Sequence, residues 1–206
     1  MADDRKHPPG RRGRLVREAK SILLMLALLT VARTSFANHY TVPSGSMENT
    51  LMPGDRVLVD MSAYGLRVPF TDITLVERGR PQRGEIAVFK SPADGSRLIK
   101  RVVAVGGDRV SVVDGHLSIN GRAMASEALP DIERFGARRA ELNLDRGGGR
   151  DVFDATIPEG QVLVMGDHRG DSFDGRYFGL VPARSLYARA TAVYWRSGDG
   201  LVWQRL

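Results

Sequence analysis

The stretch "RLIKRVVAVGGDRVSVVDGHLSIN", residues 97–120, decides the fold class. It contains three short runs rich in β-branched residues, separated by Gly-Gly-Asp and by Asp114-Gly115. The runs occupy residues 97–105, 109–113 and 116–120. An Asp-Gly pair favours a two-residue hairpin turn, because both central residues of that turn take positive φ. The stretch therefore predicts consecutive antiparallel strands.

The chain after residue 40 repeats this pattern. Further strand-like runs occupy residues 56–60, 85–90, 161–165 and 190–195. Helical periodicity is weak, and only residues 182–188 suggest a short helical turn. Segment 122–157 is the most irregular. We therefore predict a mainly β fold of antiparallel sheets, with a smaller inserted lobe at about 122–157 in an extracytoplasmic domain of residues 38–206.

The N-terminal region is different in composition. Residues 1–20 carry a net charge of +4 out of +6 for the whole 206-residue chain, and residues 21–32 are then free of charge. A helix over residues 17–37 would be long enough to cross a bilayer, with Arg33 extending its head group towards the interface. The basic tail, residues 1–16, would stay in the cytoplasm. We therefore expect one N-terminal transmembrane helix at 17–37.

Two other interpretations of this region stay open. A basic stretch, an apolar stretch and "SFA" before Asn38 are also typical of a cleavable signal peptide. The third interpretation is a soluble amphipathic helix. Since most of the positive charge lies in this tail, it does not predict a nucleic-acid partner.

Several kinds of chemistry are excluded or disfavoured. The chain has no cysteine, so thiol nucleophiles and disulfides are impossible. Its four histidines lack metal-ligand spacing, and it has no phosphate-binding glycine motif, so we expect neither a metal nor a cofactor.

Lys100 is the most unusual charged residue. It lies in an otherwise apolar strand, with Leu98 and Val102 on the same face. Burial would lower the pKa of its amine, and a neutral lysine can act as the base for a serine nucleophile. The alternative is an edge-strand lysine that reaches solvent. Ser46, in the turn-rich "TVPSGSMENTLMPGD" of residues 41–55, is the candidate nucleophile.

A third stretch, "MGDHRGDSFDGRYFG" at residues 165–179, is rich in charge. In an extended segment Ser172, Asp174 and Arg176 would project the same way, and an Asp174–Arg176 ion pair could brace a site. His168 is expected to be a solvated turn residue.

Together, the three stretches resemble the bacterial type I signal peptidase (leader peptidase) family, whose members use a serine–lysine dyad. "PSGSMENTLMPGD" resembles its serine box, "RLIKRVVAVGGD" its lysine box and "GDHRGDSFDGR" its C-terminal signature. The resemblance covers residues from about 33 to 182. The chain departs from the family pattern at His168, Gly170-Asp171 and Gly175, and at residues 104–107 of the lysine box.

The resemblance implies roles for individual residues. Ser46 would be the nucleophile, Lys100 the general base, and the Ser44 hydroxyl a donor in the oxyanion hole. Ser172 would orient the Lys100 amine by a hydrogen bond. The supporting residues would be Asp174, Arg176, Asp167 and Arg101. The substrate pocket would be lined by Val42, Met47, Leu51 and Ile99, and the membrane would be contacted by Leu66, Val68, Pro69 and Phe70.

The function implied is removal of N-terminal signal peptides from exported preproteins, after an Ala-x-Ala type site, through an acyl-enzyme. The partners would be preproteins and the lipid bilayer. The enzyme would be single-pass in the bacterial cytoplasmic (inner) membrane, with its catalytic domain outside the cytoplasm. Two alternatives stay open: a maturation peptidase serving a narrow export or conjugation system, and a non-catalytic membrane-tethered β domain that binds a partner.

Overall fold

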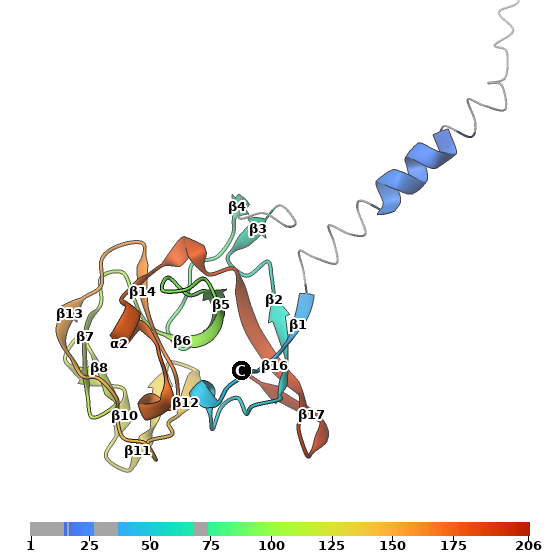
Figure 1. Ribbon diagram of the computed structural model, residues 1–206. Coiled ribbons are helices and arrows are strands. Elements are labelled where there is room, and N and C mark those ends of the chain that lie inside the picture. The colour runs from blue at the N-terminus through green and yellow to red at the C-terminus, as the bar shows by residue number, and fades with distance from the viewer. Residues whose placement is uncertain (1–14, 16, 27–36, 68–73) are drawn as a thin grey trace, which may run out of the picture.

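The computed structural model describes residues 15, 17–26, 37–67 and 74–206 (Figure 1). Residues 17–26 are helical, and within the described residues no helix has the length and apolar character needed to span a bilayer. Most of the remainder of the predicted anchor lies outside the described residues. Its predicted end is wrong, because Ala37 is the first residue of a strand and pairs with Asp60.

The main sheet contains eight strands, and all its pairs are antiparallel. Its order is β1(Ala37–Thr41), β2(Arg56–Asp60), β16(Ala188–Arg196), β5(Ile86–Lys90), β6(Arg97–Val105), β14(Gln161–Met165) and β15(Val181–Pro182), and β17(Gly200–Arg205) pairs with β16. Strand β16, the last but one in the chain, thus lies between β2 and β5. Antiparallel sheets with little helix confirm the predicted fold class.

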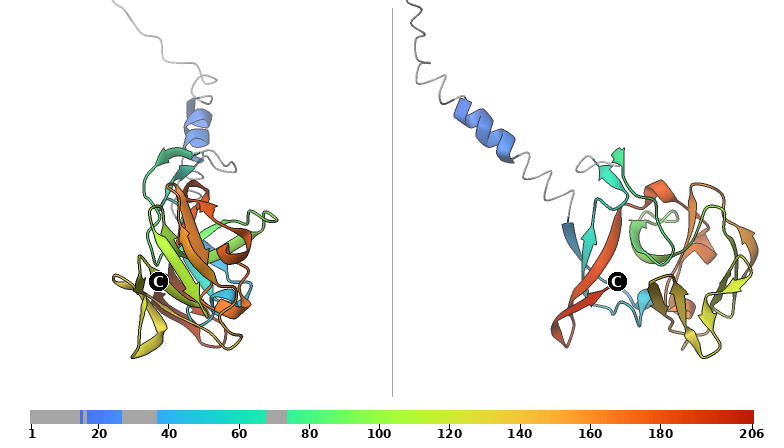
Figure 2. Two further views of the ribbon diagram at one scale, coloured as in Figure 1. Left: turned by 90° about the vertical axis from the view of Figure 1, so that its left-hand side faces the viewer. Right: turned by 180° about the vertical axis from the view of Figure 1, so that it is seen from behind.

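Three smaller sheets complete the described fold. They are β13(Val152–Thr156)–β7(Arg109–Val113)–β8(His116–Ile119)–β9(Arg122–Ala123), β10(Ala125–Ser126)–β11(Leu129–Phe135)–β12(Arg138–Glu141) and β3(Gly65–Arg67)–β4(Thr74–Glu77). Strands β7, β8 and β13 lie opposite β1, β2 and β16, with β5, β6 and β14 between them (Figures 1 and 2). The four-stranded sheet takes strands from both sides of residue 122, so the limits of the inserted lobe stay a prediction.

The strands form at the β-branched runs, and two of the turns form at Asp-Gly and Asn-Gly pairs. Each predicted run forms a strand, with bounds shifted by at most two residues in β5, β8 and β16. Asp114 and Gly115 both have positive φ, at 49° and 82°, and Asn120 and Gly121 do as well, at 51° and 77°. The hairpin at Asp114-Gly115 thus uses the turn that the sequence predicts, and Asn120-Gly121 has the same signs of φ between β8 and β9. The expected helical turn at 182–188 is a 3₁₀ turn, η3(Ala183–Ser185).

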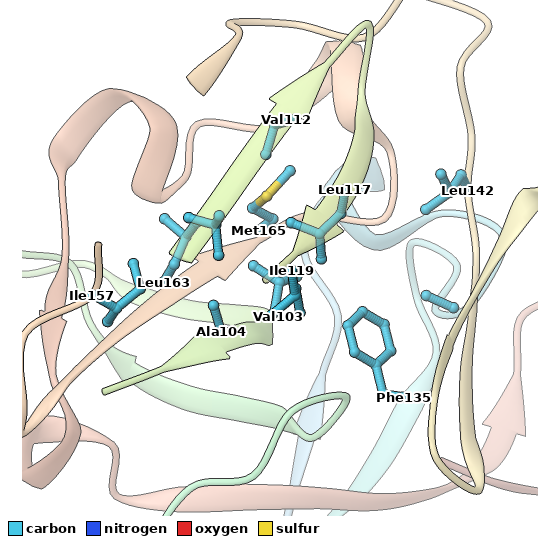
Figure 3. Packing of buried hydrophobic residues seen from close by; sticks show 12 residues of the cluster. Val103, Ala104, Val112, Leu117, Ile119, Phe135, Leu142, Ile157, Leu163 and Met165 are labelled. Carbon is cyan, nitrogen blue, oxygen red and sulfur yellow. The ribbon is translucent and has the colours of Figure 1, made fainter. Parts of the chain in front are cut away.

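Three clusters of buried apolar residues hold the sheets together. The first cluster joins β6 and β14 to the β7–β8 hairpin through Val103, Leu163, Met165, Val112 and Leu117 (Figure 3). The second cluster lies under β2 and β16 and includes Val42, Met47 and Leu51. The third cluster contains Ala87, Phe89, Val102 and Val164, and Leu98 packs against it. Leu98 and Val102 therefore share a cluster, as alternation along β6 predicts.

A buried ion pair connects the three-stranded sheet to the loop after β14. Glu133 on β11 accepts hydrogen bonds from the Arg169 guanidinium at 2.9 and 2.5 Å, and neither side chain is exposed to solvent. The same guanidinium donates to the carbonyls of Gly115 and Gly166. Arg169 thereby connects β11, the β7–β8 turn and the end of β14.

We expect Glu133→Ala to lower the free energy of unfolding by about 3–5 kcal/mol, because it leaves the Arg169 charge buried without a partner. Asp154→Asn is the matched control, since it removes the charge of a solvent-exposed pair with Arg109, keeps a residue that tolerates the positive φ of 52° at this position, and should leave stability unchanged within error. Urea unfolding of the full-length chain in detergent measures both. Equal effects would contradict the structural role of the Glu133–Arg169 pair.

Candidate active site

Ser46 lies in a short 3₁₀ turn, η1(Gly45–Met47), between β1 and β2. Met47, the last residue of the turn, and Leu51, four residues later, are fully buried in the second cluster. Their side chains fix the turn to the main sheet. The Ser44 hydroxyl oxygen lies 3.4 Å from that of Ser46. The Ser46 N–H precedes the first hydrogen bond of the turn, which runs from the Glu48 N–H to the Gly45 carbonyl, so the turn leaves this amide unused.

Lys100 reaches the same point from the middle of β6. Its side chain is 3% exposed, and Nζ donates to the Ser46 Oγ at 2.5 Å. Strand β6 is paired on both sides, with β5 and β14, so Lys100 is not an edge-strand residue reaching solvent. The structure thus brings together the two candidate catalytic residues, which are 54 residues apart in sequence.

Burial lowers the pKa of the Lys100 amine from its ordinary value of 10.5 to about 8. Loss of hydration is the largest cause, and the nearby charge of Arg176 acts in the same direction. The carboxylates of Asp174, Asp167 and Asp171 oppose it. A significant fraction of Lys100 is therefore neutral near pH 7–8, and a neutral amine can accept a proton from Ser46.

Arg101, next to Lys100, forms a buried ion pair with Asp167. The guanidinium donates to both carboxylate oxygens of Asp167, at 2.8 and 2.6 Å, and to the Gly84 carbonyl at 2.8 Å. Thr50 donates its hydroxyl to the same carboxylate at 2.5 Å. These contacts connect the Ser46 loop, β6 and the end of β14 beside the dyad.

The predicted Asp174–Arg176 ion pair is present and fully buried. Arg176 donates to both Asp174 oxygens at 2.9 Å, and Asp174 also accepts from the Gly166 N–H. The backbone is extended at Ser172 and Asp174, as expected, after a 3₁₀ turn, η2(Arg169–Asp171). The expectation is wrong at Arg176, which lies in a short helix, α2(Gly175–Phe178), capped by Asp174. The two side chains meet because the helix cap brings them together.

Ser172 does not make its predicted hydrogen bond. Its hydroxyl is buried, and among the described residues it has no hydrogen-bond partner. The hydroxyl lies against Gly166, where an added Cβ would be 2.3 Å from the Ser172 Oγ and 2.3 Å from the Ser46 carbonyl oxygen. Ser172 is therefore packed at the site, without the bond to the Lys100 amine.

Two of the departures from the family signature, Gly170 and Gly175, have local structural reasons. His168 is 2% exposed, which contradicts the expectation of a solvated turn residue. A Cβ on Gly170 would lie 2.2 Å from the Arg146 carbonyl oxygen, and a Cβ on Gly175 would lie 2.8 Å from the Val164 carbonyl oxygen. The close packing of neighbouring backbone therefore requires glycine at both positions.

The four residues predicted to line the substrate pocket lie together. Val42, Met47 and Leu51 are buried in the second cluster, and half-buried Ile99 packs against it. Beside them the Arg97 guanidinium lies 4.3 Å from the centre of the Tyr40 ring. A separate cavity of about 580 Å³, lined by residues such as Tyr64, Val105 and Glu159, contains neither Ser46 nor Lys100.

The residues predicted to contact the membrane are not placed by the described part of the chain. Val68, Pro69 and Phe70 lie outside it, and for Leu66 only the backbone, in β3, is described. Exposed apolar side chains in the neighbouring strand β4 are Leu75 and Val76.

Sequence reasoning missed several residues that touch the site or its supports. They are Glu48, Thr50, Glu133 and Asp145. A threonine or a carboxylate in a turn or an exposed hairpin carries no pattern that separates it from a solvated residue. Arg169 is the residue that could have indicated an unseen acidic partner. It lies in a loop bounded by glycines, and a buried arginine needs a nearby carboxylate.

Comparisons with known proteins place this arrangement in a family. Signal peptidase I of Pseudomonas fluorescens is 35% identical over 205 residues, covering 87% of this chain and 72% of that protein. Signal peptidase I of Pseudomonas aeruginosa is 33% identical with the same coverage. A solved signal peptidase I from Enterococcus faecalis V583 is 28% identical, covers 60% of this chain and 97% of that one, and superposes with a TM-score of 0.37.

The sequence model of the family described as signal peptidase, peptidase S26, matches residues 15–195. This is a family of serine proteases. The alternative that the sequence left open, a non-catalytic binding domain, is therefore set aside. The chain belongs to the signal peptidase I family of serine peptidases.

Proposed function

We propose that this enzyme removes signal peptides from exported preproteins with Ser46 as nucleophile and Lys100 as general base. The observation that carries the proposal is the 2.5 Å contact between the Lys100 amine and the Ser46 hydroxyl, in a site where burial lowers the pKa of the amine. A serine hydroxyl becomes a good nucleophile when a base lies next to it, and a lysine can be that base when its own pKa is depressed.

The reaction proceeds through an acyl-enzyme. Neutral Lys100 takes the Ser46 proton as Oγ forms a bond to the scissile carbonyl carbon, and the protonated amine then gives that proton to the leaving amine. Water attacks the resulting ester with Lys100 again as base, which releases the signal peptide and regenerates Ser46. One lysine therefore serves as acid and base in both halves of the reaction.

The negative charge on the tetrahedral intermediate is stabilised at η1. The Ser46 N–H and the Ser44 hydroxyl lie on either side of Gly45, and the two serine hydroxyls are 3.4 Å apart. Each oxyanion donor in such a site typically contributes about 3–4 kcal/mol to transition-state stabilisation. Glycine is required at position 45, between the two donors, because the Glu48 carboxylate occupies the space that a side chain at Gly45 would fill.

We infer cleavage after a small residue from the dense packing beside Ser46. Met47 and Leu51 are fully buried and Val42 nearly so, so these side chains leave little exposed surface of their own. A small side chain, as in an Ala-x-Ala site, fits such a surface better than a large one. The substrate would bind in an extended conformation, as in other peptide-recognition sites built from strands.

Membrane anchoring by the N-terminal region accounts for access to substrate. The apolar residues 21–32 and the basic tail before them support a helix that keeps the catalytic domain at the outer face of the cytoplasmic membrane. Signal peptides lie in the same bilayer, so anchoring raises their effective concentration at the enzyme.

Ser46→Ala and Lys100→Ala are each expected to abolish processing of a preprotein, because each removes an atom that forms or breaks a bond. Ser118→Ala, in β8 of the four-stranded sheet, is the matched control and should cleave normally. The assay is incubation of purified enzyme with several unrelated preproteins, followed by N-terminal sequencing of the products. Near wild-type cleavage by either dyad variant would contradict the assignment, and cleavage of only one preprotein would favour the narrow maturation peptidase.

The cleavage rate should rise with pH through a limb centred near the Lys100 pKa of about 8, because only the neutral amine accepts the serine proton. Asp171→Asn removes a carboxylate that raises this pKa, so the limb should move to lower pH. The measurement is kcat/KM of a fluorogenic signal-sequence peptide as a function of pH. A limb near the ordinary lysine value of 10.5, or a shift to higher pH in the variant, would contradict this.

Lys100→Met should abolish activity and yet stabilise the fold at neutral pH. Since the folded pKa of Lys100 is depressed, protonating its buried amine destabilises the native state, progressively as pH falls from 10.5 to about 8 and fully below that. The difference corresponds to about 3 kcal/mol, which sets the approximate upper limit of the gain. Urea unfolding at pH 7 and at pH 10.5 tests this, and a gain independent of pH would contradict the cause.

A further inference from the structure

The buried imidazole of His168 lies between two carboxylates. Its Nε2 makes a 2.6 Å hydrogen bond to Asp145, and its Nδ1 lies 3.2 Å from a Glu48 carboxylate oxygen. Nδ1 has no hydrogen-bond partner among the described residues. Nearby charges of the same loops are paired elsewhere, Arg146 with Asp171 and Arg169 with Glu133.

A ring that carries a proton on both nitrogens would match the two carboxylates. A carboxylate can only accept, so the bond to Asp145 requires a proton on Nε2. In the neutral ring the lone pair of Nδ1 would then face the Glu48 carboxylate, and the two would repel each other. With a proton on both nitrogens, the positive ring attracts both acids.

Glu48 lies next to the proposed oxyanion site. Its side chain folds back over the turn, and a Cβ added to Gly45 would lie only 2.4 Å from the Glu48 Oε1. Gly45 separates Ser44 from Ser46, the two residues that we assign to oxyanion stabilisation. An unneutralised carboxylate at this position would oppose the negative charge that develops in the transition state.

We infer that His168 is a positioning residue that neutralises Glu48 beside the oxyanion site and fixes the Ser46 loop to the loop that carries Asp145. The inference rests on the proposed function. The His168 N–H also donates to the Ser46 carbonyl at 3.3 Å, so the backbone of this residue contacts the middle of η1 and its side chain contacts Glu48, which follows the turn. Because the effect acts on the transition state, it concerns kcat and leaves substrate binding unaltered.

The test is a double-mutant cycle on the full chain with a fluorogenic signal-sequence peptide. His168→Gln keeps the backbone contact and removes the positive charge, and it should lower kcat about tenfold with KM nearly unchanged. Glu48→Gln removes the charge that needs neutralising, so the Glu48→Gln/His168→Gln double variant should recover to within about threefold of Glu48→Gln alone. His116→Gln is the matched control, because His116 lies on β8 near Asp131 and should leave kcat unchanged.

The outcomes separate this inference from the proposed dyad. Wild-type kcat in His168→Gln, or a double variant no faster than His168→Gln, would overturn the role of His168 even where Ser46→Ala is inactive. Cleavage by Ser46→Ala would instead overturn the dyad. A histidine needed only for packing would give losses that add in the double variant, in place of the recovery. If His168→Gln does not fold, as judged by circular dichroism, His168→Asn carries the same expectations in the same cycle.

Discussion

The burial of one lysine amine is the constraint on which the site depends. Lys100 is nearly inaccessible because β6 is paired on both sides and the third cluster packs against the residues around it. Removing water from an ammonium group costs more than the nearby carboxylates return, so the pKa falls towards neutrality. The same burial that suits the amine to its proposed role as a base destabilises the fold, which is a common conflict between activity and stability.

The carboxylates near Lys100 do not cancel this effect because each is already paired. Asp174 gives both oxygens to Arg176, and Asp167 gives both to Arg101. From the position of Lys100 each pair is closer to a dipole than to a full negative charge. Were either arginine absent, the bare carboxylate would stabilise the protonated amine and raise the pKa. The buried ion pairs therefore protect the base as well as the loop geometry.

Much of the fold could be predicted from sequence, and the reasons are local. β-branched runs specify strands, and Asp114-Gly115 specifies its own turn, because both signals lie within a few residues. Lys100 was predictable because a charge in an apolar strand contradicts its surroundings. His168 and Glu133 were not, since their partners lie in other segments and a carboxylate in a hairpin looks solvated until the loop covers it. The alternation of Ser172, Asp174 and Arg176 predicts the Asp174–Arg176 pair but not the local structure at Arg176, because a helix capped by Asp174 begins at Gly175.

The three-stranded sheet is connected to the proposed dyad by a series of charged and hydrogen-bonded groups. Glu133 on β11 fixes Arg169, and Arg169 holds the Gly166 carbonyl from one side. The Gly166 N–H is bound by Asp174, whose charge acts on Lys100. Glycines at 148 and 170 allow the loop of residues 145–149 to pass against these groups, with backbone close to the β7–β8 turn. A substitution far from Ser46 on β11 can therefore alter the base through geometry that no local sequence pattern records.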